Sequence, residues 1–221
     1  MAASDEPRLK FHAVLFDLDG VLVDSGAEVE QAWREWASER GLDPDEVARS
    51  SHGRRSADHI RLVAPHLDWN AEAALLERRE TETANAVTPL PGAFALYESV
   101  PSASRAVVTS GSRPLATARL QGAGFAFPHV LVTADDVSEG KPDPEGYLQA
   151  AHRLKVAPAG ALVIEDTPAG IAAGKAAGMA VLAVATTYPP EALTAADAVI
   201  DSAESVSVIA KSMELELRRL T

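Results

Sequence analysis

Short apolar runs alternate with longer segments of helical pattern along most of the chain. The runs are rich in Val, Ile and Leu, as in strands that are buried on both faces, and they cover residues 11–16, 105–109, 130–133, 161–164 and 180–185. Helical patterns lie between them, over residues 112–121, 144–154 and 168–177. This alternation predicts an α/β fold with a doubly wound, Rossmann-like parallel sheet and helices on its faces.

The predicted helices carry start and stop signals next to the strands. Asp143 and Thr167 each precede a proline, which is typical of an N-cap followed by the first helical position. Gly178 suits the end of a helix. Since these helices begin directly after strands, the strand ends should lie at the carboxyl edge of the sheet, where open α/β folds bind ligands.

Residues 25–87 break the alternation. Val29, Ala32, Trp33 and Trp36 recur at helical spacing, and no convincing strand follows before the proline-rich segment 88–92. We therefore predict an inserted α-helical cap domain over residues 24–89, which would act as a lid, and a core domain made of residues 1–23 and 90–221. The tail at 214–220 fits either a strand or a short helix.

The composition and net charge of the chain limit the classes of molecule that it is expected to bind. The 221 residues can bury one core plus a subdomain, and 32 acidic against 20 basic residues give a net charge of −12 without a basic run. This balance argues against nucleic acid as a partner. The absence of cysteine, of a secretory pattern at the start and of a long apolar stretch predicts a cytoplasmic protein with no membrane partner. We expect a monomer or a small homo-oligomer, since no heptad pattern is visible.

Two acidic pairs follow predicted strands. Asp17 and Asp19 come after the run 11–16, and Glu165 and Asp166 come after the run 161–164. If these strands are neighbours, the four carboxylates share an oxygen-rich pocket that suits Mg²⁺ rather than zinc. The alternative is that each pair only caps a helix or lies in solvent.

Three further groups could handle a phosphate. Thr109 and Ser110 end a strand before a glycine and a helix start, where hydroxyl and N–H groups can bind phosphate oxygens. Lys141 lies in a loop stiffened by two prolines, and a fixed ammonium can neutralise a phosphoryl group. In the cap, His52, Arg54 and Arg55 could reach a substrate from a closed lid. Ordinary helix caps and surface side chains are the alternatives for all three groups.

Four segments in order resemble the motifs of the haloacid dehalogenase-like hydrolase superfamily: DLDGVLVDS at 17–25, VVTSGS at 107–112, GKPDPE at 140–145 and IEDTPAGIAAGKAAGM at 164–179. The insertion resembles the helical cap of its beta-phosphoglucomutase-like branch. The resemblance implies Asp17 as nucleophile and Asp19 as general acid and base. It also implies phosphate binding by Thr109, the Ser110 amide and Lys141, and Mg²⁺ binding by Asp17, the Asp19 carbonyl, Asp166 and Glu165, the last in or just outside the first shell.

Within that branch the chain looks most like sugar and polyol phosphatases of the glycerol-3-phosphatase and 2-deoxyglucose-6-phosphatase type. Mutases of the branch typically carry a histidine in the first cap helix, at the position that Val29 has here. The prediction is therefore a Mg²⁺-dependent phosphatase that hydrolyses a small sugar or polyol phosphate through an aspartyl-phosphate. A hexose-phosphate mutase and a phosphometabolite-binding module without turnover are the alternatives.

Overall fold

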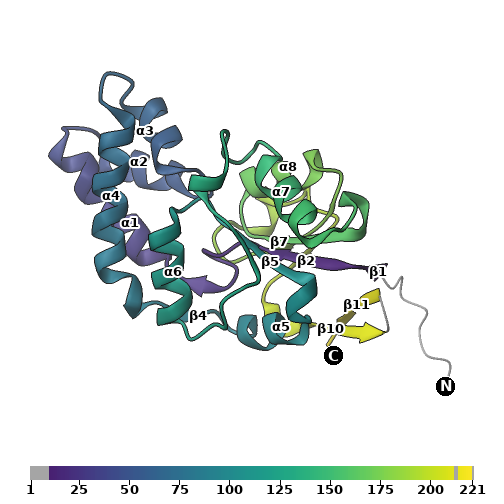
Figure 1. The fold of residues 1–221 in the computed structure, drawn as a ribbon. Helices are drawn as coiled ribbons and strands as arrows, with labels where there is room; N and C mark the ends of the chain where they lie inside the picture. The colour runs from purple at the N-terminus through teal and green to yellow at the C-terminus, as the bar shows by residue number, and fades with distance from the viewer. Residues whose placement is uncertain (1–9, 212–213, 221) are drawn as a thin grey trace.

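A parallel six-stranded sheet forms the centre of the molecule (Figure 1). The computed structural model describes residues 10–211 and 214–220. The strand order is β6-β5-β2-β7-β8-β9, with β2 at Ala13–Phe16, β5 at Arg105–Val108, β6 at Val130–Val132, β7 at Ala161–Glu165, β8 at Ala180–Val184 and β9 at Ala198–Ile200. The predicted α/β fold is confirmed, and β9 is a strand that the sequence pattern did not predict.

Helices cover both faces of this sheet. Alternate side chains of one strand point to opposite faces, so Phe16 packs in the apolar cluster under α5 (Ala93–Ser99) and α6 (Arg113–Gly122). Its neighbour Leu15 packs in the cluster under α7 (Glu145–Leu154) and α8 (Pro168–Ala176). Short 3-10 helices complete the chain at Ala84–Ala86, Ser102–Ser104, Ala134–Asp136, Pro158–Gly160, Pro190–Ala192 and Ala203–Ser205.

The predicted helix signals are present next to the strands. Thr167 is the N-cap of α8, where its side chain accepts a hydrogen bond from the Gly170 amide, and Pro168 follows at the first position. Gly178, just after α8, has a φ of 75°. Helix α7 begins at Glu145 with Pro144 as its N-cap, one residue later than expected, and Asp143 accepts from the Glu145 amide at 2.9 Å.

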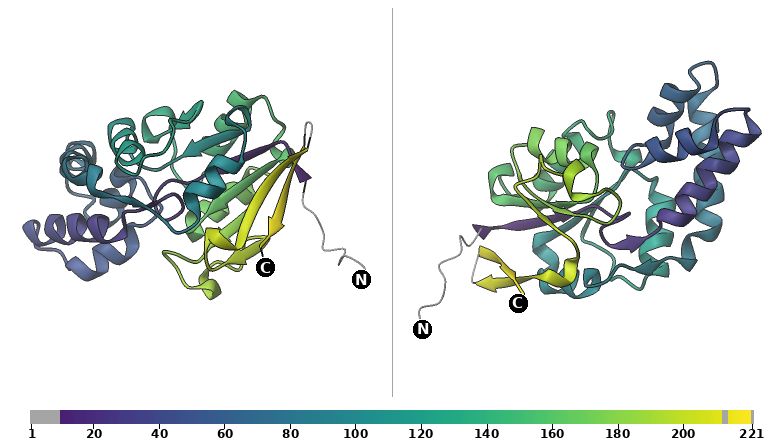
Figure 2. Two further views of the ribbon diagram at one scale, coloured as in Figure 1. Left: turned by 90° about the horizontal axis from the view of Figure 1, so that it is seen from below. Right: turned by 180° about the vertical axis from the view of Figure 1, so that it is seen from behind.

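Four helices form a separate lobe beside the core, shown in purple to blue in Figures 1 and 2. They are α1 (Gly26–Glu39), α2 (Pro44–Ser51), α3 (Ser56–Val63) and α4 (Trp69–Thr83). Trp33, Trp36 and Leu76 are buried in an apolar cluster of their own. This lobe is the predicted helical cap.

The chain enters and leaves the cap through two adjacent strands. β3 (Val23–Asp24) pairs antiparallel with β4 (Thr88–Pro89), and Asp24 lies opposite Thr88. We propose this crossing as the domain boundary, with residues 24–89 as the cap.

A second, antiparallel sheet lies against α5 and has the order β1-β11-β10. It consists of β1 (Lys10–Phe11), β10 (Val206–Lys211) and β11 (Glu214–Arg219), so the tail is a strand and not a helix. The first predicted strand is interrupted at His12, whose amide donates to the Gly160 carbonyl. None of the helices within 10–211 and 214–220 has the length and apolar character that a membrane span requires.

Candidate active site

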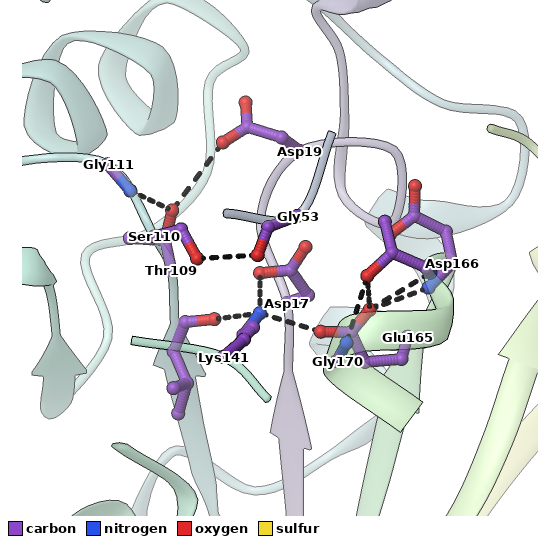
Figure 3. A network of polar contacts seen from close by, with 12 residues as sticks. Asp17, Asp19, Gly53, Thr109, Ser110, Gly111, Lys141, Glu165, Asp166 and Gly170 are labelled. Atoms are coloured by element: carbon purple, nitrogen blue, oxygen red, sulfur yellow. Dashed lines mark hydrogen bonds and ion pairs between the residues drawn. The ribbon is translucent and has the colours of Figure 1, made fainter. Parts of the chain in front are cut away.

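The ammonium of Lys141 joins three strand ends at the carboxyl edge of the sheet (Figure 3). Its Nζ donates to Asp17 Oδ1 at 2.7 Å, to Glu165 Oε1 at 2.6 Å and, more weakly, to the Val108 carbonyl at 3.4 Å. Lys141 is only 8% exposed. Burial acts to lower the pKa of Lys141, but the carboxylates of Asp17 and Glu165 raise it by more than burial lowers it. The pKa therefore lies above the ordinary value for lysine, and the side chain is a cation. The predicted convergence of β2 and β7 is present, because these strands are paired neighbours.

Both oxygens of the Glu165 carboxylate are already occupied by donors. Oε1 accepts from the Tyr147 hydroxyl at 2.8 Å in addition to Lys141. Oε2 accepts from the amides of Asp166 and Thr167 and from the Thr167 hydroxyl. A Cβ on Gly170 would lie 1.8 Å from this carboxylate, so only glycine fits there. Glu165 therefore fixes both Lys141 and the turn into α8.

Asp166 differs, since its Oδ1 is buried without a hydrogen-bond partner in the described part of the chain. Oxygens of Asp17, Glu165 and Asp166 lie within 4.8 Å of one another. Burial, with repulsion from Glu165, raises the pKa of Asp17 to about 7 against the opposing effect of Lys141. The same two causes raise the pKa of Asp166 well above its ordinary value. An orphaned oxygen in an all-carboxylate cluster with excess negative charge fits a hard divalent cation such as Mg²⁺.

Asp19 lies on the other side of Asp17, after the chain leaves β2. Its Oδ1 accepts from the Ser25 hydroxyl at 2.7 Å and from Arg119 Nη1 at 2.9 Å. Its Oδ2 is 3.5 Å from the Thr109 hydroxyl. Arg119, on α6, also contacts Glu80 of α4. Burial raises the pKa of Glu80 to about 7, although Arg119 opposes this shift.

Neither Arg119 nor Glu80 was predicted as a site residue. Each is one of many charged residues in a helical segment, and no local motif singles it out.

The turn after β5 faces both the core site and the cap. The Thr109 hydroxyl accepts from the Gly111 amide at 3.1 Å. The Ser110 hydroxyl donates to the Gly53 carbonyl of the cap at 3.0 Å. The cap therefore contacts the turn that was predicted to bind phosphate.

The three cap residues predicted from the sequence divide into two groups. His52 and Arg54 line the pocket that contains Asp17, together with Trp33 and Val29. Arg55 instead pairs with Asp58 and donates to the Val137 carbonyl at 3.1 Å, and it lines a smaller cavity with Ser110 and Lys141. In this arrangement Arg55 links the cap to a core loop.

Comparison with known proteins places this geometry in a family. A model of the haloacid dehalogenase-like hydrolase family matches residues 11–178. The chain belongs to this family. It is 43% identical over 199 residues to hexitol phosphatase A of Escherichia coli, with 88% of this chain and 92% of that protein covered. It is 33% identical to glycerol-1-phosphate phosphohydrolase 2 of Saccharomyces cerevisiae, with 90% and 86% covered.

Solved structures agree with this assignment. The fold superimposes on the beta-phosphoglucomutase of Clostridium difficile with a TM-score of 0.77 at 26% identity, covering 87% of this chain and 92% of that chain. The comparisons confirm the family, its beta-phosphoglucomutase-like branch and the prediction of a phosphoric monoester hydrolase.

Proposed function

We propose that this enzyme is a Mg²⁺-dependent phosphatase that hydrolyses a small sugar or polyol phosphate through an aspartyl-phosphate on Asp17. The observation that carries the proposal is the Asp17 carboxylate, which is buried, held by Lys141 and lines the same pocket as Asp19. The names of the relatives support the substrate class, since they act on hexitol and glycerol phosphates.

The turn after β5 and Lys141 would bind the phosphate group of the substrate. The Thr109 hydroxyl, the Ser110 amide and the Lys141 ammonium would take the phosphoryl oxygens. Lys141 donates to Asp17, and the turn at Thr109 and Ser110 follows β5, which pairs with the strand β2 that ends at Asp17. A carboxylate that attacks a phosphate dianion meets charge repulsion, and a fixed cation such as Lys141 relieves it.

Asp17 and Asp19 divide the covalent chemistry. Asp17 attacks phosphorus while Asp19 gives a proton to the departing alcohol oxygen. Asp19 then takes a proton from the water that hydrolyses the aspartyl-phosphate, so the carboxylic acid is regenerated for the next cycle.

Asp17, the main-chain carbonyl of Asp19 and Asp166 would hold Mg²⁺. The bound cation supplies positive charge that offsets the repulsion between carboxylate and phosphate. Glu165 would not bind the cation directly, because its two oxygens already accept from Lys141, Tyr147 and the turn into α8.

The cap supplies the wall opposite the phosphate. His52 and Arg54 would bind substrate hydroxyls, while Trp33 offers an apolar surface to a carbon chain. Arg55, predicted as a third substrate contact, would instead help to seat the cap on the core.

Phosphate release tests the proposal. A panel of hexitol, glycerol, hexose and nucleotide monophosphates is assayed with Mg²⁺ and with chelator, for the parent and for Asp17→Asn. We expect release from a sugar or polyol phosphate that requires both Mg²⁺ and Asp17. An Asp17→Asn variant as active as the parent would exclude the covalent route, and interconversion of hexose phosphates without release would favour a mutase.

A further inference from the structure

Arg119 is a buried arginine that links two carboxylates from different parts of the chain. Nη1 lies 2.9 Å from Asp19 Oδ1, and Nη2 lies 2.8 Å from Glu80 Oε2. Arg119 is 4% exposed and Glu80 is 7% exposed. All three residues line the pocket that contains Asp17.

Stabilisation of the fold does not by itself explain a buried cluster of one arginine and two carboxylates. Removing charged groups from water is costly, and well-packed apolar side chains of similar volume often serve a fold at least as well as a buried ion pair. Elsewhere in the cap, ion pairs lie nearer to solvent: the side chains of Arg79 and Glu39 are 34% and 46% exposed. The buried cluster instead lies beside the reacting groups, which suggests a role in the reaction.

The contacts of Asp19 show what that role is. Its Oδ1 accepts from both Arg119 and Ser25, so two donors occupy this oxygen. Its Oδ2 is the oxygen that faces the turn after β5, 3.5 Å from the Thr109 hydroxyl. With Oδ1 held, the carboxylate cannot rotate freely, and Oδ2 is kept toward the phosphate-binding side.

We propose that Arg119 is a positioning residue that holds Asp19 for proton transfer and, through Glu80, links this orientation to the seated cap. The inference rests on the proposed function. In the first step the bond from Asp17 to phosphorus forms, the bond from phosphorus to the leaving oxygen breaks, and a proton passes from Asp19 Oδ2 to that oxygen. Arg119 and Ser25 remain on Oδ1 throughout.

Glu80 connects this arrangement to the cap because it belongs to α4, whereas Arg119 belongs to the core helix α6. The guanidinium can contact both carboxylates only when α4 lies against α6. A cap that lifts away removes Glu80 from Arg119 and loosens the support behind Asp19. Proton transfer is thereby favoured when the cap is seated over a substrate.

The dependence on leaving group tests the role of Arg119. The value of kcat/KM reports the steps up to loss of the leaving group. An alkyl phosphate such as glycerol phosphate needs a proton on its leaving oxygen, whereas p-nitrophenyl phosphate has a leaving group that departs without one. We expect Arg119→Met to lower kcat/KM about 100-fold or more for the alkyl phosphate and less than about 10-fold for the aryl phosphate.

Matched variants distinguish a loss of Asp19 positioning from a general loss of folding. Arg113→Met removes another arginine of α6, the partner of Asp136, and should leave kcat/KM for both substrates unchanged. Arg119→Lys keeps the charge and should recover at least about tenfold of the lost alkyl activity. If Arg119→Met does not fold, Arg119→Lys is compared on the two substrates in the same way. Glu80→Gln should lower only the alkyl value, by about 10-fold.

Equal losses for the two substrates in Arg119→Met or Arg119→Lys would overturn the positioning role, and so would no loss at all. Failure of the proposed function gives a different result: the parent releases no phosphate from either substrate, or Asp17→Asn releases it as fast as the parent.

Discussion

Replacing Lys141 by methionine removes one buried positive charge and leaves the carboxylates of Asp17 and Glu165 without the cation that pairs with them. Methionine has a similar length and is apolar, so the pocket stays filled. The side chains of Lys141 and Asp17 are each 6% exposed, and that of Glu165 is 0% exposed. Taking one partner from a buried ion pair typically costs about 3–5 kcal/mol of unfolding free energy. We expect Lys141→Met to fall in that range.

An exposed pair of equal length provides the control. Lys175 lies 2.6 Å from Asp197, the same distance as Lys141 from Glu165, but its two side chains are 40% and 42% exposed. Surface pairs contribute about 1 kcal/mol or less, so Lys175→Met should cost no more than that. The difference between the two variants measures the effect of burial.

Urea unfolding in the presence of chelator provides the measurement, since no metal can then replace the lost cation. The double variant Lys141→Met/Glu165→Gln should regain part of the loss, because one uncompensated carboxylate is gone. A Lys141→Met variant as stable as Lys175→Met would refute the reasoning, and would mean that the site carboxylates bind protons instead of requiring the ammonium.

Substitutions at Asp166, Gly170 and His59 test the metal site, the turn into α8 and the buried part of the cap. Asp166→Asn should raise the Mg²⁺ concentration for half-maximal activity more than about 10-fold, and an unchanged Mg²⁺ titration would remove Asp166 from the metal site. Gly170→Ala should lower the unfolding free energy by about 1–3 kcal/mol in urea because its Cβ meets a carboxylate, whereas Gly26→Ala, with open space, should raise it by up to about 1 kcal/mol. Burial lowers the pKa of His59, so the unfolded chain binds a proton first as the pH falls below 6.5. His59 should therefore lower the unfolding free energy of the parent, relative to that of His59→Leu, by up to about 1.4 kcal/mol per pH unit as the pH falls below 6.5. The raised pKa values of Asp17 and Glu80 act in the opposite direction but are common to both proteins, so urea unfolding of the two at each pH isolates the His59 effect.

Strand ends could be predicted from the sequence because their chemistry is local. A buried run followed at once by Asp17 or Glu165 fixes both the element and the edge on which the carboxylate lies. The proline loop around Lys141 is equally local. Parallel pairing then brings these groups together without any knowledge of side-chain packing.

The support behind Asp19 could not be predicted in this way. Arg119 and Glu80 are 39 residues apart, and their contact depends on how α4 packs on α6. The second sheet is also non-local, because the strand β11 near the end of the chain pairs with β1 near its start. The charges along a helix do not indicate which distant charge each one contacts, and alternation in a short tail does not indicate which strand the tail pairs with.

The adjacent crossings β3 and β4 have an evolutionary consequence. Because Asp24 and Thr88 lie opposite each other in one antiparallel pair, the whole lobe between them enters and exits at a single point of the core. An inserted domain whose two ends lie side by side can be replaced by a domain of different length without changing the strand order of the core sheet. Substrate preference could therefore diversify by replacement of this inserted domain while Asp17, Lys141 and Asp166 keep their places.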